Sequence, residues 1–372
     1  MDSRSPFDVL PAPTIARVDL AALVHNARLL ARRAAPARLM AVVKANAYGH
    51  GAAACARALE TDGVEAFAVA TTAEALALRE AGVLGRILVF GAPFEADLAA
   101  ATAHALEVNA CSLGAVERIV HSGAALRVHV KVDTGMHRLG LAPEEVPEAL
   151  RRLREAPRVE VVGLWSHLAT SDAHADAQAR RMETFQGLAP DVPRHLQNSG
   201  GVLYGAGRLD AATLVRTGIA LYGADPEGDE AHAASAGLRP VLSLLSRVAQ
   251  VRTIRAGEAV SYGRTWTAPR ETRLATVACG YADGLPRLLS NRGAMTIAGR
   301  RYEIAGRVCM DMTMLDLGAP NGSGAEVREG DEVVVFGVGG VPVEQVARWA
   351  ETISYEVLTG VGARVPRVYE GG

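Results

Sequence analysis

Short apolar runs alternate with stretches of helical periodicity from about residue 14 to residue 220. Runs rich in β-branched residues, separated by Ala/Leu/Glu/Arg segments, are typical of repeated strand and helix units around a parallel sheet. We count eight strand candidates, and eight is the number that closes a barrel. They are Leu39–Val43, Ala66–Ala70, Ile87–Phe90, Leu106–Asn109, Leu126–Val132, Val159–Leu164, His195–Gln197 and Leu214–Arg216.

Helical stretches fill the gaps between these candidates. Thr72–Ala81, for example, has a capping residue at Thr71 or Thr72 and ends at Gly82. A doubly wound open sheet is the alternative architecture. The first strand candidate is not followed by the G-x-G-x-x-G pattern of a dinucleotide-binding sheet, which weakens that alternative.

The pattern changes after Tyr222. Residues 224–237 are rich in Ala, Gly, Asp and Glu and indicate a boundary or surface loop. We therefore predict an α/β protein with an N-terminal (β/α)8 barrel over residues 1–236 and a mostly-β C-terminal domain over residues 237–372. The expected strands of this domain are Val241–Ile254, Ala259–Tyr262, Arg273–Cys279, Met295–Ile297, Arg301–Ile304 and Glu332–Phe336, followed by a helix over Val343–Thr352.

Composition narrows the class of protein. A chain of 372 residues with 49% hydrophobic and 22% charged residues is typical of a soluble globular protein of two domains. The formal net charge of −2 and the absence of a long basic run give no sign of a nucleic-acid partner. We find no secretory signal and no apolar segment of membrane-spanning length, and expect a cytoplasmic protein.

Cysteine and histidine spacing gives no sign of a metal site. The four cysteines lie far apart without a C-x-x-C pair, so we interpret them mostly as buried small hydrophobic residues. His121, His129 and His137 fall in unlike local contexts and show no ligand spacing.

Polar residues follow the predicted strands at the point where each strand ends. A (β/α)8 barrel places its active site at this carboxyl-terminal end and often binds phosphate after strands seven and eight. The small residues of Asn198–Gly201 and of Thr217–Ile219 leave backbone N–H groups open to a phosphate. The residues at strand ends are Lys44, Lys131, Asp133, Ser166, His167, Asn198, Ser199, Arg216 and Gly218.

The segment Val42–Gly51 carries the most specific signal. A lysine that closes a buried strand is costly to bury unless its pKa falls, and such a lysine is a nucleophile suited to Schiff bases. Taken alone, this junction is more often a surface lysine. The full segment, VVKANAYGHG, resembles the pyridoxal-phosphate lysine motif of alanine racemases. The resemblance implies that Lys44 carries the cofactor and that Tyr48 binds its phosphate.

Further motifs match the same family in the same order. The segment KVDTGMHRLG implies that Arg138 contacts the substrate carboxylate and that Lys131 is a candidate for carbamylation. WSHLAT implies that His167 lies near the cofactor ring. VRTGIALYG implies that Arg216 faces the pyridine nitrogen, and because arginine keeps its proton, the ring is then a weaker electron sink that favours reprotonation of Cα.

The second domain carries matching motifs as well. VSYGRTW implies that Tyr262 is the second acid/base and comes from the partner subunit of a head-to-tail dimer. RVCMDM implies that the Met310 backbone binds the substrate carboxylate, and ISYE implies that Tyr355 touches the phosphate. Two positions depart from the family pattern, Leu285 for a tyrosine and Ser354 for a proline. The expected entrance residues are Tyr281, Arg287, Arg307 and Asp311.

The resemblance covers nearly the full chain and implies a homodimer with shared active sites that interconverts L- and D-alanine through an external aldimine of pyridoxal 5'-phosphate. Lys44 and Tyr262 exchange the Cα proton on opposite faces. The expected cofactor-binding set is Lys44, Tyr48, His167, Asn198, Ser199, Arg216, Gly218, Ile219 and Tyr355. A broader-specificity racemase, a decarboxylase of the same fold and a non-catalytic regulatory protein are the alternatives. Biosynthetic supply of D-alanine for peptidoglycan and catabolic removal of D-alanine both stay open.

Overall fold

A computed structural model describes residues 12–170, 173–183, 189–190, 192–207 and 212–372. Contacts within the chain group it into two compact units. The first, which we call the barrel unit, is Leu23–Leu221, and the second, the β unit, combines the described residues up to Ala22 with Tyr222–Gly372. The boundary that the sequence predicts between residues 236 and 237 stays a prediction.

The barrel unit contains one sheet of eight strands. Each strand lies within two residues of its predicted bounds, so the alternation of apolar and helical segments correctly located all of them. In chain order they are β2 (Arg38–Val42), β3 (Ala66–Val69), β4 (Arg86–Val89), β5 (Glu107–Ala110), β6 (Leu126–Lys131), β7 (Val159–Trp165), β8 (Arg194–His195) and β9 (Leu214–Thr217).

Among the described residues, neighbouring strands of this sheet pair in parallel, in the order β8-β7-β6-β5-β4-β3-β2-β9. Backbone hydrogen bonds also join the two end strands. The Thr213 N–H donates to the Arg194 carbonyl at 3.1 Å, and the Arg216 N–H donates to the Gln197 carbonyl at 2.9 Å. The sheet is therefore closed, as a (β/α)8 barrel requires.

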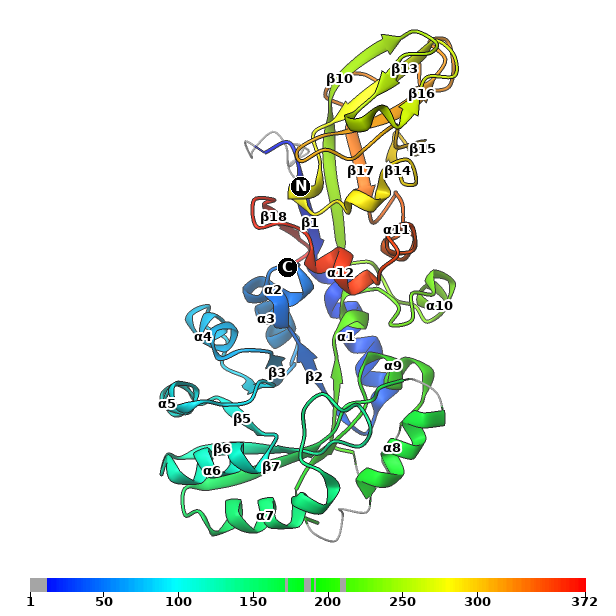
Figure 1. The fold of residues 1–372 in the computed structure, drawn as a ribbon. Coiled ribbons are helices and arrows are strands. Elements are labelled where there is room, and N and C mark those ends of the chain that lie inside the picture. Colours follow the sequence, from blue (N-terminus) through cyan, green and yellow to red (C-terminus); the bar gives the residue numbers. More distant parts are fainter. Residues whose placement is uncertain (1–11, 171–172, 184–188, 191, 208–211) are drawn as a thin grey trace. The chain divides into compact units, whose positions relative to one another are not determined.

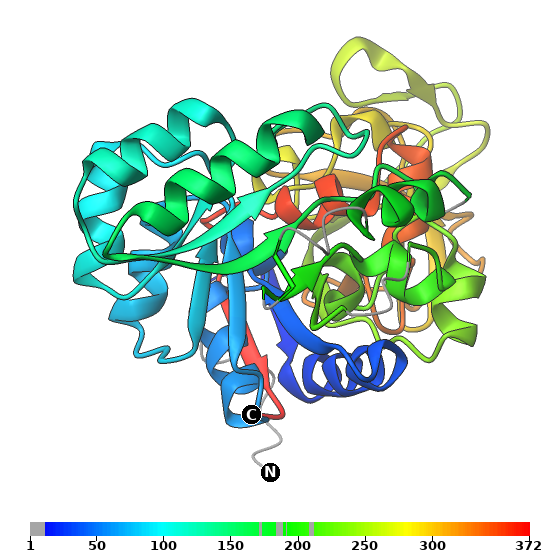
Figure 2. The same ribbon diagram turned by 90° about the horizontal axis from the view of Figure 1, so that it is seen from below.

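Helices follow the strands and lie on the outer side of the sheet (Figures 1 and 2). The Thr71 hydroxyl caps α4 in a capping box with Glu74, and the Ser112 hydroxyl caps α6, which fixes where these helices begin. The helices are α1 (Leu20–Ala34), α2 (Lys44–Tyr48), α3 (Ala52–Thr61), α4 (Thr72–Glu80), α5 (Glu95–Ala103), α6 (Leu113–His121), α7 (Val146–Glu155), α8 (Ala173–Glu183) and α9 (Ser199–Tyr204).

The β unit is built around a long strand, β10 (Leu242–Ile254), and the mostly-β prediction is confirmed. β10 pairs antiparallel with β1 (Ile15–Asp19), β13 (Thr272–Val277) and β17 (Glu332–Phe336). The remaining strands are β11 (Ala259–Val260), β12 (Trp266–Thr267), β14 (Ala294–Ile297), β15 (Arg300–Glu303), β16 (Thr313–Gly318) and β18 (Arg367–Glu370). Its helices are α10 (Glu230–Ser235), α11 (Val343–Trp349) and α12 (Ser354–Thr359).

Four strands of the β unit were not predicted, namely β1, β12, β16 and β18. β1 lies far from its partners in sequence, pairing with β10 and, in parallel, with β18. The predicted strand Ala259–Tyr262 was too long at its end, because it stops at Val260 and residues 262–264 form a 3₁₀ turn.

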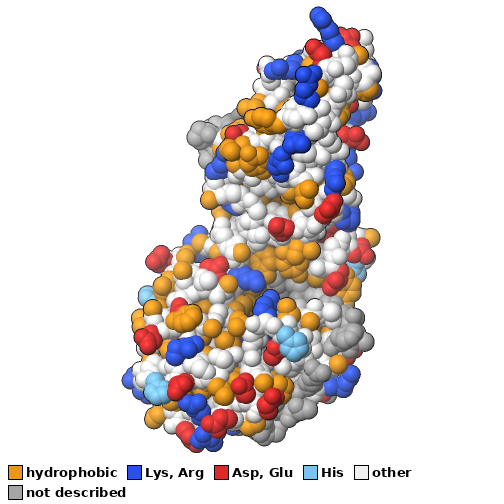
Figure 3. All heavy atoms as spheres, in the orientation of Figure 1, with side chains coloured by type: hydrophobic (Ala, Val, Ile, Leu, Met, Phe, Trp, Pro, Cys, Tyr) orange, Lys and Arg blue, Asp and Glu red, His pale blue; other side chains and the backbone are white. Residues whose placement is uncertain are grey.

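The mixed charges on the surface agree with the small net charge of the chain, and the cysteines are mostly buried. Acidic and basic side chains are interspersed over the face shown in Figure 3. Of the four free cysteines, Cys55, Cys111 and Cys279 are buried and Cys309 is half-buried. In the part of the chain that the structure describes, no helix has the length and apolar character needed to cross a membrane.

Candidate active site

A pocket at the carboxyl-terminal end of the barrel strands brings together four of the predicted site residues. Lys44, Lys131, Arg138 and His167 line it. These residues follow or end three different strands, β2, β6 and β7, and meet because parallel strands present their carboxyl ends at one edge. The apolar part of the lining is Ala70, Phe90, Gly91, Leu139 and Trp165.

Lys44 directly follows Val43 at the end of β2 and is half-buried. Burial lowers the pKa of its ammonium group, and the nearby positive charge of Arg138 lowers it further, while Glu74 opposes the shift. A lysine whose pKa is lowered has more of its neutral, nucleophilic form at working pH. This amine can therefore condense with an aldehyde.

The backbone after Lys44 forms a left-handed turn that the sequence did not predict. Ala45, Asn46, Ala47 and Tyr48 have φ values of 51°, 54°, 55° and 51°. Such conformations are costly for residues with a Cβ atom and persist only where other contacts hold them. Here the Asn46 side chain accepts a hydrogen bond from the Ala52 N–H at 2.8 Å, and Glu74 accepts one from the Ala45 N–H at 2.6 Å.

This turn brings Tyr48 against the loop that follows β9. A Cβ atom added to Gly218 would lie 2.3 Å from the Tyr48 hydroxyl, so position 218 has no room for a side chain. The Ser199 hydroxyl, at the start of α9, accepts hydrogen bonds from the N–H groups of two residues of this loop, Gly218 at 2.9 Å and Ala220 at 3.3 Å. Hydroxyl groups and backbone N–H groups gathered around a glycine suit a phosphate.

Two more residues of the expected cofactor-binding set, Asn198 and Ile219, flank this group. The Asn198 side chain caps α9 by accepting a hydrogen bond from the Gly201 N–H at 3.0 Å. Ile219 is fully buried and begins a 3₁₀ turn, Ile219–Tyr222. The structure thus brings Tyr48, Asn198, Ser199, Gly218 and Ile219 together.

Arg216 is held in a fixed orientation by its neighbours. Its Nη2 donates to the carbonyl groups of Ser166, at 2.6 Å, and Leu196, at 3.0 Å, and its Nη1 donates to His195 Nδ1 at 3.0 Å. Burial lowers the pKa of Arg216 to about 9, which still leaves the guanidinium charged at neutral pH.

The third donor of Arg216 fits a cofactor. Nε is buried and, among the described residues, has no hydrogen-bond partner. A buried donor without a partner costs roughly 1–3 kcal/mol, so an acceptor belonging to a bound molecule is the expected partner. The ring nitrogen of pyridoxal phosphate is such an acceptor, and together with Lys44 and the hydroxyl groups near Gly218 the residues present fit this cofactor.

His167 and Lys131 complete the wall of the pocket. Burial and the positive charge of Arg216 hold the pKa of His167 well below its usual value, so its ring is uncharged. Burial, with the charges of Arg216 and Arg138, lowers the pKa of Lys131 to about 7. The Lys131 ammonium nitrogen lies 4.1 Å from the centre of the Trp165 ring.

In the β unit, the loops that carry most of the other predicted residues are joined by hydrogen bonds. Ser261 Oγ donates to the Arg307 carbonyl at 2.7 Å, and the Tyr281 N–H donates to the Cys309 carbonyl at 3.0 Å. The Arg307 guanidinium lies near Gly263. The structure thereby groups Tyr262, Tyr281, Arg307, Met310 and Asp311, with Arg287 in the adjoining 3₁₀ turn Arg287–Leu289.

Sequence reasoning missed Arg364, which ties this group together. Its guanidinium contacts Asp283 at 2.7 Å and Asp311 at 2.8 Å. Tyr355 lies in α12. Burial raises the pKa of Tyr355, and the carboxylates of Glu227 and Asp225 raise it further, so its hydroxyl stays protonated and can donate.

Comparison with known proteins places these features in one family. The family model described as alanine racemase, N-terminal domain, matches residues 18–226, and that described as alanine racemase, C-terminal domain, matches residues 241–369. Alanine racemase of Mycolicibacterium vanbaalenii is 43% identical, over 96% of this chain and 94% of that protein. Alanine racemase of Acidithiobacillus ferrooxidans is 41% identical, over 95% of this chain and 98% of that protein.

Solved structures agree with the sequence comparison. The biosynthetic alanine racemase from Pseudomonas aeruginosa matches with a TM-score of 0.87 and 38% identity, over 96% of this chain and 99% of that chain. Alanine racemase from Bartonella henselae, with covalently bound pyridoxal phosphate, matches with a TM-score of 0.87 and 33% identity, over 97% of this chain and 100% of that chain.

Proposed function

Because this chain belongs to the alanine racemase family, a family of pyridoxal-phosphate-dependent racemases, we propose that it interconverts L-alanine and D-alanine by two-base proton transfer. The observation that carries this proposal is the half-buried Lys44 amine, with its lowered pKa, in one pocket with Arg138 and His167. When bound, the cofactor supplies an aldehyde that condenses with an amine and a ring that accepts electron density from the substrate's Cα.

Lys44 has two roles in this proposal. Its amine would hold the cofactor in the resting enzyme, and as a free amine beside the bound substrate it would take or give the Cα proton on one face. The lowered pKa supports both roles because each needs the neutral amine. Tyr262 of the partner subunit serves the opposite face, since one base reaches only one side of a planar carbon.

The exposed position of Tyr262 supports a role across an interface. Its side chain is 71% exposed, and it lies in a turn with positive φ at Ser261, Gly263 and Arg264. Tyr281, Met310 and Met312 on neighbouring loops are also exposed. Exposed aromatic and methionine side chains that gather in this way are typical of protein interfaces. We propose a homodimer in which each site takes residues from both copies.

Arg216 favours racemisation over other reactions of the same cofactor. A guanidinium that keeps its proton would not protonate the ring nitrogen it faces, and this would favour rapid return of a proton to the substrate's Cα over other reactions. A decarboxylase of this fold generally has an acidic residue there. The burial and the fixed hydrogen bonds of Arg216 support this assignment.

Arg138 and Met310 are proposed to bind the substrate carboxylate. Arg138 is an exposed residue and, within the described part of the chain, has no ion-pair partner, so its planar set of donors is open to a carboxylate. Tyr281, Arg287, Arg307 and Asp311 are proposed entrance residues. The cytoplasmic location and the biosynthetic or catabolic role stay predictions.

Reduction with borohydride tests the cofactor assignment. The purified holoenzyme absorbs visible light when the cofactor is joined to a lysine, and reduction converts that bond into a stable secondary amine. We expect loss of the absorbance and, on peptide mapping, a phosphopyridoxyl group on Lys44. A group found on Lys131 and not on Lys44 would contradict the proposal.

Carbamylation of Lys131 is expected to depend on pH. The neutral amine adds carbon dioxide, forms an N–C bond and releases a proton, and the resulting carbamate places a negative charge beside Arg138. Since the pKa of Lys131 is about 7, the amine is mostly neutral above pH 7 and mostly protonated below it. The carbamate therefore decreases as the pH falls below about 7.

The measurement is carbon-13 NMR of the holoenzyme in labelled bicarbonate. We expect a carbamate signal in the wild-type protein that is missing from Lys131→Met. Lys44, the other lysine of the chain, is assigned to the cofactor and cannot serve as a matched variant, so wild type in unlabelled bicarbonate is the control. A signal that persists in Lys131→Met would show that Lys131 is not the modified residue.

A further inference from the structure

A row of buried polar side chains leads from the amino-terminal end of the barrel to Arg216. We call Glu107, His129, His195 and Arg216 the buried network. Glu107 Oε2 lies 2.8 Å from His129 Nε2, His129 Nδ1 lies 3.0 Å from His195 Nε2, and His195 Nδ1 lies 3.0 Å from Arg216 Nη1. None of the four side chains is more than 2% exposed as a residue, so water does not compete for these bonds.

The barrel makes room for this network at one glycine. β7 lies between β6, which carries His129, and β8, which carries His195. A Cβ atom on Gly163 of β7 would lie 2.1 Å from His129 Nδ1. A glycine is therefore needed where His129 passes β7 to reach His195. Trp165 stacks on His195, with ring centres 5.7 Å apart, and holds its plane.

The position of each proton in the network follows from Arg216. An arginine side chain only donates, so His195 Nδ1 accepts and its proton is on Nε2. That proton is donated to His129 Nδ1, so the proton of His129 is on Nε2 and is donated to Glu107. Each neutral imidazole has one donor and one acceptor, and the row runs in a single direction from Arg216 to the carboxylate.

The charge states of Glu107 and of the two histidines agree with this assignment. Burial alone would raise the pKa of Glu107, but hydrogen bonds from His129 and Arg86 lower it to about 2. Burial lowers the pKa of His129 and, with the charge of Arg216, holds that of His195 well below its usual value. Glu107 is therefore ionised and both imidazoles are neutral.

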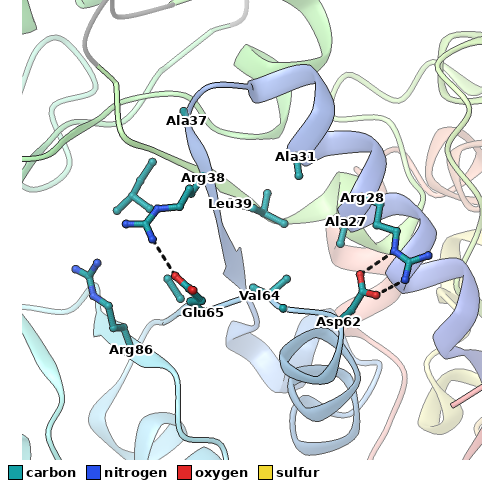
Figure 4. Close-up of a pocket in the computed structure, with 13 residues that line it drawn as sticks. Ala27, Arg28, Ala31, Ala37, Arg38, Leu39, Asp62, Val64, Glu65 and Arg86 are labelled. Atoms are coloured by element: carbon teal, nitrogen blue, oxygen red, sulfur yellow. Dashed lines mark hydrogen bonds and ion pairs between the residues drawn. The ribbon is translucent and has the colours of Figure 1, made fainter.

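The far end of the network reaches a pocket at the amino-terminal end of the barrel. Arg86 donates to Glu107 at 2.7 and 3.1 Å, and its side chain lines this pocket. Figure 4 shows Arg86 there beside the pair formed by Arg38 and Glu65. Arg127 also contacts Glu107, at 3.4 Å. The carboxylate thus lies between the arginines at this end and His129.

We propose that Glu107 is a positioning residue for the racemisation reaction: through His129 and His195 it fixes the imidazole tautomers that give Arg216 Nη1 an acceptor. Arg216 then keeps the orientation that leaves its buried Nε without a partner among the described residues. The inference rests on the proposed function, which assigns that Nε–H group to the ring nitrogen of the cofactor. Glu107 itself has no contact with the pocket around Lys44.

A neutral amide at position 107 removes this constraint. The side chain of Glu107→Gln has the same shape, but its NH2 group can donate to His129 Nε2. In the molecules where it does so, His129 and His195 have the reverse tautomers, and His195 places an N–H group against the N–H of Arg216; where the amide oxygen accepts instead, the tautomers stay as in the wild type. Two facing donors repel, so Arg216 changes its orientation or loses a bond.

The first measurement uses the wild-type holoenzyme with nitrogen-15-labelled histidine. We expect the Nδ1 atoms of His129 and His195 to have the chemical shifts of unprotonated nitrogens and both Nε2 atoms those of protonated ones. A proton on Nδ1 of His195 in the wild type would overturn the inference, whatever the folding of any variant.

The second measurement compares three variants of the holoenzyme. In Glu107→Gln we expect mixed tautomers at His195 and a kcat lower by roughly tenfold or more, the size typical of outer partners of catalytic groups, with a smaller change in KM. Glu107→Asp keeps the carboxylate and should recover the wild-type tautomers and part of kcat. Arg86→Gln is the control, since it removes the ion pair with Glu107 but leaves the bond to His129.

Two results of the variant comparison would also overturn the inference. One is a Glu107→Gln protein that is less stable but keeps the wild-type tautomers and kcat. The other is an Arg86→Gln protein that loses as much kcat as Glu107→Gln, because a loss common to both would come from the ion pair alone. A wild-type protein that does not racemise alanine would instead contradict the proposed function and leave the tautomer assignment standing.

Discussion

Replacing Lys44 by alanine is expected to lower the rate of racemisation by roughly 10³-fold or more. The change removes the amine that holds the cofactor and one of the two proton carriers, and general acid–base catalysis alone contributes roughly 10²- to 10⁴-fold. Cofactor binding through the hydroxyl groups around Gly218 is expected to persist in weaker form, because Tyr48 and Ser199 are unchanged. The measurement is the rate of D-alanine formation by chiral chromatography.

The control for this variant is Lys44→Arg, which keeps the positive charge but cannot condense with the aldehyde. Both variants are expected to lose the visible absorbance that borohydride removes from the wild type. Near-normal turnover by Lys44→Ala, without an added amine, would show that another residue carries the cofactor.

Mixing two inactive variants is expected to restore activity if the sites are shared between subunits. Lys44→Ala and Tyr262→Phe homodimers each lack one proton carrier at every site. A heterodimer has one intact site, which takes Lys44 from the Tyr262→Phe subunit and Tyr262 from the other. Random pairing makes about half of the dimers mixed, each with one good site of two, so about a quarter of wild-type activity should return.

The control for the mixing experiment is a pair of variants at the same position, Lys44→Ala with Lys44→Arg, which cannot produce an intact site. Heterodimers are confirmed with differently tagged subunits. If confirmed heterodimers have no more activity than the separate variants, Tyr262 acts within its own subunit, and the shared-site proposal fails while the racemase assignment stands.

Much of the barrel could be predicted from the sequence because its determinants are local. Each strand is a short apolar run bounded by turn residues, and helix starts such as Thr71, with Glu74 three residues later, are visible as capping patterns. Residues at the ends of parallel strands share one edge by topology, so the grouping of Lys44, Lys131 and His167 was predictable as well.

Other features depend on pairings that no local pattern contains. β1 was missed because its partners, β10 and β18, lie more than two hundred residues away, and a pairing over that separation leaves no local periodic signal. The left-handed turn at Ala45–Tyr48 was missed because alanine normally favours right-handed helix and only the surrounding contacts impose the turn.

The buried network was missed for a related reason. His129 showed no ligand spacing in the sequence, and His195 was named only as the first residue of a predicted strand. Their contact depends on Gly163 in a third strand, which no local pattern contains. The available signal was a charged residue, Glu107, at the start of a strand whose other residues are buried. A buried carboxylate requires partners, and that requirement would have directed attention to the histidines of neighbouring strands.

The most direct test of the central claim is incubation of the purified holoenzyme with either pure enantiomer of alanine. The two enantiomers have equal free energies in an achiral solvent. A racemase therefore brings both incubations to equal amounts of L- and D-alanine without loss of total alanine. That is the result we expect. No interconversion from either L-alanine or D-alanine would contradict the account. Consumption of alanine with release of carbon dioxide or pyruvate would assign the site to a different reaction.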